Sequence, residues 1–504
     1  DFQTVLQKRL IESLVPDNIS RQVLGYLTLF ASKASRLGVA GVMALLFSAL
    51  ALVFTVVGPL RSDLPSWAWS WWLLASLVAL ALWARARRAA HGQGTTAASP
   101  SGVGSGFWPG PMPAPLRPAL LMLLSAALID LFMGLWHGGG WDLLRQDGKV
   151  LLSLPMAWLV LAGLGLQAQQ TEVYRGQETG GQARRGHSSG PQATGLHQPA
   201  ALYEALCWAM GLQMVVALAV ALYWPRAWLP ATPIPWATAV ALNVAVLAPL
   251  ALVRPGASGG VDCSFEGRAW RLGLGLAVLA GVVAVVLSRS RAAWVVLPWL
   301  GLLVVAFAPR RAPAAVAVLA MMGAVLGAGL WYDSLQPAQV ERGMRLLDLV
   351  QELTQWSQSD AGTSVGSRLV LWEAAWNSLW AHPWVGIGVE ARIALVQTVV
   401  PPDTLPDVAP LVHVHQQFLN QAVDHGLPGL MAALLCAGAP FALAWRAPTT
   451  TMRWQCLGVG VVHTVGLMFN ANMTHGTYAV NFGLVLMAIL WMQASRDAAG
   501  GHDA

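Results

Sequence analysis

The sequence predicts an all-α, polytopic membrane protein that carries one large helical loop outside the membrane. Of the 504 residues, 56% are hydrophobic and 11% are charged, whereas a soluble domain carries roughly 25% charged residues. The apolar residues also gather in long runs, and about 20 such residues are enough for one helix to cross a bilayer. Composition and run length together argue against a soluble globular fold.

By this rule the chain contains about twelve transmembrane helices. Tryptophan stands at the ends of many of the runs, for example Trp67, Trp136 and Trp331, as expected for an aromatic belt at the membrane–water interface. The expected spans lie near residues 37–60, 67–84, 115–136, 150–167, 200–224, 229–253, 269–288, 291–308, 312–331, 424–445, 454–471 and 477–495.

Loop charges predict the orientation, because arginine-rich loops stay in the cytoplasm. Residues 85–117, 309–313 and 446–453 carry arginines and no acid. Residues 331–414 carry nine acids against four arginines, a net charge of −5, which predicts a periplasmic loop and a bacterial inner-membrane location. The expected parts are an N-terminal cytoplasmic or interfacial segment (1–36), spans one to nine (37–331), the periplasmic loop (332–414), spans ten to twelve (415–495) and a cytoplasmic tail (496–504).

The net charge of +6 does not indicate nucleic acid as a partner. Its arginines lie in short loops between apolar runs, where they set orientation. Cys207, Cys436 and Cys456 lie inside apolar runs and Cys263 in a short loop, so the cysteines form neither a disulfide framework nor a metal-binding pair. We expect membrane lipids as neighbours and no cofactor.

Arg289 and Arg291 break the orientation rule. They lie in the short turn of "VVLSRSRAAWVV" (285–296), which faces outward in the expected topology. One interpretation is that both side chains reach lipid headgroups. The other is an anion site, because a guanidinium fork matches phosphate oxygens and the next helix N-terminus adds its dipole.

The stretch "SRLVLWEAAWNSLWAHPWVGIG" (367–388) predicts a helix from an N-cap at Ser367 to about Ala381, since His382 precedes a proline. Trp372, Trp376 and Trp380 recur every four residues and predict one aromatic stripe. The helix either lies on the membrane surface or offers a wall for sugar or lipid. Arg368 stands in its expected first turn, against the helix dipole, and so favours an anionic partner.

Two histidines open "HVHQQFLNQAVDHGLPGL" (413–430) at the mouth of an apolar run. The polar residues that follow His415, beginning with Gln416 and ending with Asp424, are tolerated only in a cavity or bundle interior. A neutral imidazole is suited to take a proton near pH 7. A structural role for His413, or a metal site for the pair, remains open at this point, although His-x-His alone is a weak zinc signal.

In order and spacing these motifs resemble the O-antigen ligase and polymerase superfamily over roughly residues 270–495. The resemblance implies that Arg291 and Arg368 bind diphosphate and that His415 is the general base. We expect Arg289 to join the diphosphate site, and His413, Gln416, Trp372 and Trp376 to support it. The family has asparagine where this chain has Gln416. We further expect the imidazole of His413 to point away from His415.

The resemblance implies a metal-independent inverting glycosyltransferase. It would move O-antigen from undecaprenyl diphosphate to lipid A-core during lipopolysaccharide biosynthesis, with its active site facing the periplasm. The alternatives are an O-antigen polymerase or a protein O-oligosaccharyltransferase, which use the same donor with another acceptor. A lipid or anion transporter fits less well, because most of the spans lack polar residues.

Overall fold

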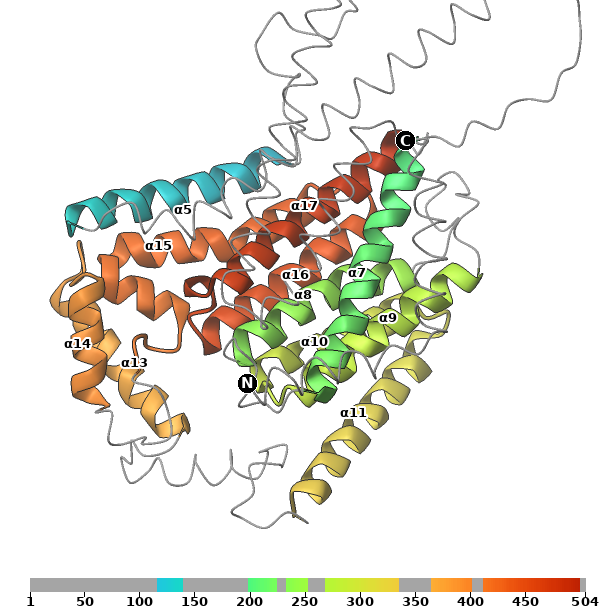
Figure 1. Cartoon of the computed structure of the whole chain (residues 1–504), viewed down its shortest axis with the longest axis horizontal. Helices are drawn as coiled ribbons and strands as arrows, with labels where there is room; N and C mark the ends of the chain where they lie inside the picture. The colour runs from blue at the N-terminus through green and yellow to red at the C-terminus, as the bar shows by residue number, and fades with distance from the viewer. Residues whose placement is uncertain are drawn as a thin grey trace, which may run out of the picture.

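Every regular element that the computed structural model describes is a helix, and no strand occurs within residues 116–138, 198–223, 233–252, 268–334, 364–400 and 411–498. The prediction of a helical fold is confirmed for these residues (Figure 1). The elements are α5 (Leu116–Trp136), α7 (Gln198–Tyr223), α8 (Pro233–Leu252), α9 (Arg268–Leu287), η4 (Arg291–Val295), α10 (Val296–Phe307), α11 (Arg311–Ser334), α13 (Ser364–Ala381), α14 (Val389–Val399), α15 (Gln417–Trp445), α16 (Thr450–Phe469), η6 (Asn472–Thr474) and α17 (Gly476–Ala498).

Four of these helices are long and apolar enough to cross a membrane: Arg117–Trp136, Pro233–Leu252, Trp270–Leu287 and Gln417–Trp445. The expected spans 37–60, 67–84 and 150–167 lie outside the described residues. The total of twelve spans and the sidedness of the loop stay predictions.

Three expected boundaries need correction. Residues 291–308 are not one continuous α-helix, because 291–295 is a 3-10 helix and α10 runs from Val296 to Phe307; whether this apolar stretch, Arg291–Phe307, is a span stays a prediction. The run expected at 424–445 begins as a helix at Gln417. Helix α13 ends at Ala381 as expected, but it begins at Ser364. Ser367 therefore lies inside the helix and is not its N-cap.

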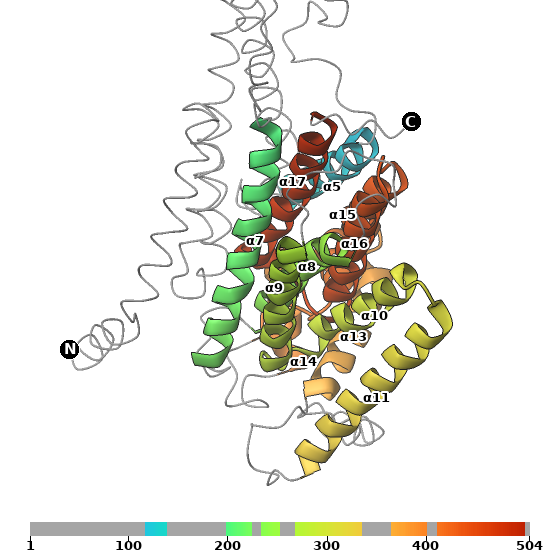
Figure 2. The ribbon, with the colours of Figure 1, turned by 90° about the vertical axis from the view of Figure 1, so that its right-hand side faces the viewer.

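Helix α8 forms the centre of the bundle. All sixteen residues from Pro235 to Leu250 are buried, and α7, α9, α16 and α17 pack around it (Figures 1 and 2). Buried amides fix the register: Asn481 Oδ1 accepts hydrogen bonds from Gln213 Nε2 at 3.2 Å and from Asn243 Nδ2 at 3.1 Å. These two hydrogen bonds satisfy amide N–H groups of Gln213 and Asn243 inside an apolar bundle.

Helix α15 connects this bundle to the rest of the described chain. One of its sides packs against α5, and its N-terminal part packs against α13 and α14, which lie together at one end of the molecule (Figure 1). A kink at Gly426 divides α15 into two parts. The polar residues singled out in the sequence lie on the part that precedes this kink.

Candidate functional site

The segment 411–416, here called the histidine loop, leads into α15. His415 has φ of 53°, and Arg289 in the α9–η4 turn has φ of 55°. No other non-glycine residue in the described ranges has a positive φ. Such a conformation costs on the order of 1–3 kcal/mol and persists only where the surroundings impose it. Both strained positions are residues that the sequence assigned to the site.

Three side chains hold the backbone of the histidine loop. Trp372 Nε1 of α13 donates to Val414 O at 3.0 Å, and Val414 N donates to Asn420 Oδ1 at 3.4 Å. Arg392 Nη1 of α14 donates to Val412 O. The loop is therefore fixed from α13, from α14 and from α15 itself.

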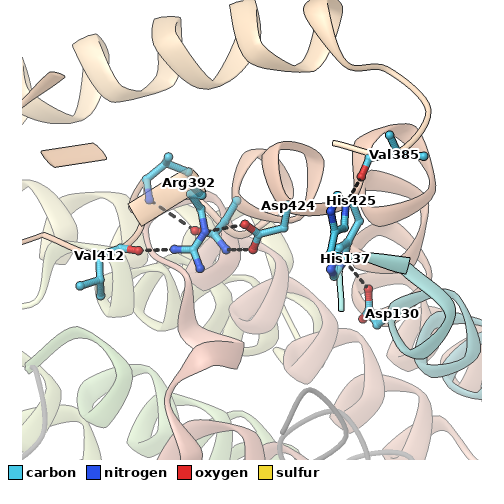
Figure 3. Close-up of polar contacts among 9 residues, drawn as sticks. Asp130, His137, Val385, Arg392, Val412, Asp424 and His425 are labelled. Atoms are coloured by element: carbon cyan, nitrogen blue, oxygen red, sulfur yellow. Dashed lines mark hydrogen bonds and ion pairs between the residues drawn. The ribbon is translucent and has the colours of Figure 1, made fainter. Parts of the chain in front are cut away.

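The same Arg392 forms a buried ion pair with Asp424 (Figure 3). Its Nε lies 2.6 Å from Asp424 Oδ1, and the two residues are 6% and 3% exposed. The second carboxylate oxygen accepts from Asn420 Nδ2 at 3.2 Å. Because each charged group also has a hydrogen bond outside the pair, burial of the pair is compensated.

The segment 382–388 packs against the kink of α15, backbone to backbone. Ile387 N donates to Val423 O at 2.8 Å, Gly388 N to Asp424 O at 3.1 Å, and Leu427 N to Pro383 O at 2.7 Å. The kink leaves these α15 groups available because Gly426 has φ of 67° and Pro428 has no N–H to donate. Helices α13 and α14 are thereby fastened to α15 through main-chain contacts.

Helix α5 is joined to this assembly at its C-terminal end (Figure 3). His137 Nε2 lies 2.6 Å from Val385 O, and its ring stacks on His425 with centroids 6.2 Å apart. The Nδ1 atom of His425 lies 3.5 Å from Asp130 Oδ1. These contacts connect α5, the 382–388 segment and α15 beside the histidine loop.

Three imidazoles gather at the loop. The ring centroids of His413 and His415 are 4.3 Å apart, and those of His413 and His475 are 5.7 Å apart. The expectation that His413 points away from His415 is therefore wrong. The two side chains, two residues apart in the sequence, contact each other edge to face.

All three histidines are neutral at pH 7. Burial is the main cause: it lowers the pKa of His413 to about 3, and those of His415 and His475 to about 4. For His415 the next largest cause is the positive charge of Arg368, which lies close enough to disfavour protonation. A neutral imidazole carries the lone pair that a general base needs.

Asn470, which follows α16, contacts His415 directly. Its Oδ1 lies 3.1 Å from His415 Nδ1, and its Nδ2 donates to Asn472 Oδ1 at 2.9 Å. The neighbouring Met473 N donates to Gln417 Oε1 at 3.1 Å. The connection between α16 and α17 thus closes the site opposite α13.

Gln416 has a structural role in the loop. Its Oε1 accepts from Leu419 N at 2.5 Å, which makes Gln416 the N-cap of α15. An asparagine or glutamine oxygen at this position satisfies one of the free N–H groups of the first turn.

Arg368 is the fifth residue of α13, not a first-turn residue, because the helix begins at Ser364. The argument from the helix dipole is therefore weaker than expected, since that effect fades beyond the first turn. The assignment of Arg368 to the site rests instead on its positive charge, which lowers the pKa of His415.

Arg289 and Arg291 lie in the turn before α10, and η4 packs against α8 and α16. Helix α10 runs antiparallel to α16, because a Cβ on Gly458 would meet Trp299 while Phe307 contacts Trp454. The turn therefore lies toward the Phe469 end of α16, the end from which Asn470 reaches His415.

The three tryptophans of α13 do not act as one stripe. Trp372 is half-buried and bonded to the histidine loop. Trp376 and Trp380 are 51% and 58% exposed, with ring centroids 5.5 Å apart. A four-residue spacing advances by slightly more than one helical turn, so the side chains drift around the helix.

Sequence reasoning missed Asn470, His475 and Arg392. The first two belong to "FNANMTH" (469–475), a polar interruption between two apolar runs, and that interruption was the available signal. Arg392 had no comparable signal, because its ion pair depends on how α14 packs on α15. Within the described ranges, no three His, Cys, Asp or Glu side chains form a group that could hold a metal ion.

Two comparisons with known proteins bear on this site. A family model described as O-antigen ligase matches residues 276–434, a range that includes the α9–η4 turn, α13, α14 and the histidine loop. Short matches also relate the chain to UPF0761 membrane proteins. Those of Albidiferax ferrireducens and Verminephrobacter eiseniae are 63% identical over 55 residues, and that of Delftia acidovorans is 59% identical over 54. Each match covers 11% of this chain and 13% of the relative.

Proposed function

We propose that this chain, which matches the O-antigen ligase family model over residues 276–434, is an inverting glycosyltransferase. Its donor is a glycan linked to undecaprenyl diphosphate, and its acceptor is a hydroxyl of lipid A-core. The product is lipopolysaccharide that carries O-antigen. The matched segment of this chain spans only 13% of the UPF0761 relatives, whose names state only that they are membrane proteins, so they carry no part of this proposal.

The observation that carries the proposal is the position of His415 beside Arg368. A neutral imidazole and a guanidinium, one to accept a proton and the other to bind an anion, are the two groups that transfer from a diphosphate ester requires. The positive charge of Arg368 acts on His415, and Asn470 Oδ1 lies 3.1 Å from Nδ1 of its imidazole.

In the proposed reaction the acceptor oxygen attacks the anomeric carbon of the donor sugar. The bond from that carbon to the diphosphate oxygen breaks, and its electron pair leaves with the diphosphate. The hydroxyl proton passes to His415. Attack on the side opposite the leaving group inverts the anomeric centre.

Arg368 stabilises the charge that grows on the leaving diphosphate, because a fixed cation in a site of low dielectric acts without reorganisation. Arg289 and Arg291 extend the same anion site from the α9–η4 turn. The strained backbone at Arg289 supports this assignment, since a headgroup contact at a flexible surface requires no such conformation.

The central experiment compares variants in a purified transfer assay with lipid-linked glycan and lipid A-core. General-base assistance is worth about 10² to 10⁴ in rate, so His415→Ala is expected to lose transfer by that factor and still bind the donor. Arg368→Ala is expected to weaken donor binding and transfer together, with poor rescue by Arg368→Lys, which lacks the bidentate fork. Near-normal transfer by folded His415→Ala would contradict the proposal.

The acceptor is identified by deleting the gene and examining lipopolysaccharide. Undecorated core with accumulated lipid-linked polymer indicates a ligase. Core that carries a single repeat unit indicates an O-antigen polymerase, and unchanged lipopolysaccharide with unglycosylated proteins indicates a protein O-oligosaccharyltransferase.

We also propose that the site faces the periplasm of the bacterial inner membrane, on the basis of the acidic 331–414 segment between basic loops. Asn377 is exposed on α13, so a cysteine placed there tests this orientation. An impermeant thiol reagent is expected to label it in cells with a permeabilised outer membrane. Labelling only after lysis of the inner membrane would reverse the orientation.

A further inference from the structure

Asn470 meets His415 in a way that fixes which nitrogen of the imidazole carries the proton. The amide of Asn470 has two ends, and its Nδ2 donates to Asn472 Oδ1 at 2.9 Å. This contact orients Oδ1 toward His415 Nδ1, 3.1 Å away. An amide oxygen only accepts hydrogen bonds. Nδ1 of the neutral ring must therefore be the donor, and the lone pair is on Nε2.

The two asparagines are themselves immobilised. Asn470 is 2% exposed and Asn472 is fully buried. Asn470 N donates to Gly466 O at 3.1 Å, and a Cβ at Gly466 would lie 2.8 Å from Asn472 Nδ2. The absence of a side chain at Gly466 thus gives the amide of Asn472 its place beside α16.

The ring and the backbone of His415 are held from different directions. Trp372 and Arg392 hold the loop backbone just before it, at Val414 and Val412, while Asn470 holds the imidazole. Among the described residues, Nε2 of His415 has no hydrogen-bond partner. That atom is left for a ligand.

We propose that Asn470 is the positioning residue of His415: it keeps the proton on Nδ1, so that Nε2 is the atom that accepts the proton of the acceptor hydroxyl. This inference rests on the proposed function, in which His415 is the base. The hydroxyl proton moves to Nε2 as the oxygen attacks, and the resulting imidazolium still donates from Nδ1 to Asn470 Oδ1. Asn470 itself never contacts the reacting atoms.

Asn470→Asp provides a test that a purely structural role would not pass. A carboxylate accepts the same hydrogen bond and adds a negative charge, which favours the imidazolium and raises the pKa of His415. Arg368 and His475 lower the pKa of His415, and the ring of His413 lies edge to face against that of His415; all three residues are unchanged in this variant. Because more of His415 is then protonated at a given pH, the acidic limb of kcat is expected to move to higher pH.

A double-mutant cycle gives an independent test at fixed pH. Asn470→Ala is expected to lower kcat, by no more than the loss of about 10² to 10⁴ that removal of the base itself causes, with little change in the KM of the donor. If Asn470 acts through His415, then Asn470→Ala has no further effect in a His415→Ala background.

Asn243→Ala is the matched control, because Asn243 is also a fully buried amide but lies in the bundle centre bonded to Asn481. It is expected to lower stability without moving the acidic limb. If Asn470→Asp does not fold, the double-mutant cycle with Asn470→Ala decides the question.

The outcomes separate the two proposals. A wild-type acidic limb in folded Asn470→Asp, or additive losses in the cycle, would overturn the positioning role while His415 remained the base. A folded His415→Ala variant with near-normal transfer would overturn the proposed function itself. A moved limb together with non-additive losses supports the positioning role.

Discussion

The guanidinium of Arg392 lies 2.6 Å from the carboxylate of Asp424, and both residues are buried. This pair joins α14 to the first half of α15. Because Arg392 also donates to Val412 O, the same side chain reaches the histidine loop. The shape of the candidate site therefore depends on a charge pair that does not itself face the site.

Breaking this pair on one side is expected to destabilise the protein strongly. Loss of one partner of a buried ion pair costs about 3–5 kcal/mol, whereas replacing both by apolar residues is often neutral. Arg392→Met or Asp424→Leu alone should therefore lower the free energy of unfolding by that amount, and the double variant should recover most of it. Thermal unfolding in detergent measures this.

Transfer activity is expected to recover less than stability in the double variant, because Val412 O and Asn420 lose their partners along with the pair. A double variant that loses the sum of the two single losses would mean that the two side chains are not energetically coupled.

The glycines at the junction of the 382–388 segment and α15 give a second prediction. Gly386 and Gly426 have φ of 66° and 67°. A Cβ at Gly386 would lie 2.5 Å from Asp424 C, and one at Gly426 would lie 2.5 Å from Pro383 O. Both neighbours are backbone atoms and cannot move aside, so Gly386→Ala and Gly426→Ala should each cost more than the 1–3 kcal/mol or so of the strained φ alone.

Gly275→Ala is the matched control, because a Cβ there meets nothing within 4 Å and the residue lies inside α9. It should be neutral or stabilise by roughly 0.5–1 kcal/mol, as alanine does in a helix. Melting temperatures of the three variants decide the matter. Equal effects at Gly275 and Gly386 would show that the backbone contacts contribute nothing.

The histidine cluster predicts a loss of stability in acid. His413, His415 and His475 have lowered pKa values in the folded protein, about 3, 4 and 4, against about 6.5 in an unfolded chain. Between these values the unfolded state binds more protons, so stability falls as the pH drops from about 6.5 toward 4. Each histidine contributes at most about 1.4 kcal/mol per pH unit.

Unfolding midpoints measured at pH 7 and pH 5 test this prediction. His413→Gln and His475→Gln should each reduce the slope between the two values, since glutamine does not titrate. An unchanged slope in both variants would show that these imidazoles are hydrated in the folded protein.

Much of the site could be predicted from local patterns. The polar run after His415 predicted that these residues lie in the interior, and Gln417, Asn420 and Asp424 are buried. The end of α13 at Ala381 followed from the proline two residues later. In both cases residues close in sequence contain the whole physical cause.

What escaped prediction depends on contacts between distant segments. Arg392 is 32 residues from Asp424 and Asn470 is 55 from His415, and no periodicity links such pairs. The positive φ of His415 is likewise imposed by Trp372, Arg392 and Asn470, not by the residues beside it.

The two kinds of tryptophan on α13 provide the last prediction. Trp372 Nε1 donates to Val414 O, so Trp372→Phe keeps an aromatic ring at this position but leaves the carbonyl of Val414 without its donor. Such a loss costs about 1–3 kcal/mol. If one or two kcal/mol of that cost displaces the histidine loop from its catalytic position, kcat should fall by a factor of about 5–30. Trp376→Phe is the matched control, because Trp376 is 51% exposed and its ring contact with Trp380 survives the change. It should leave kcat within twofold or so, as surface substitutions usually do little.

The transfer assay that compares both variants at saturating donor separates two interpretations of the helix. Equal losses would favour an aromatic wall that binds sugar or lipid along all of α13. A loss confined to Trp372→Phe would show that this tryptophan acts through the backbone that presents His415.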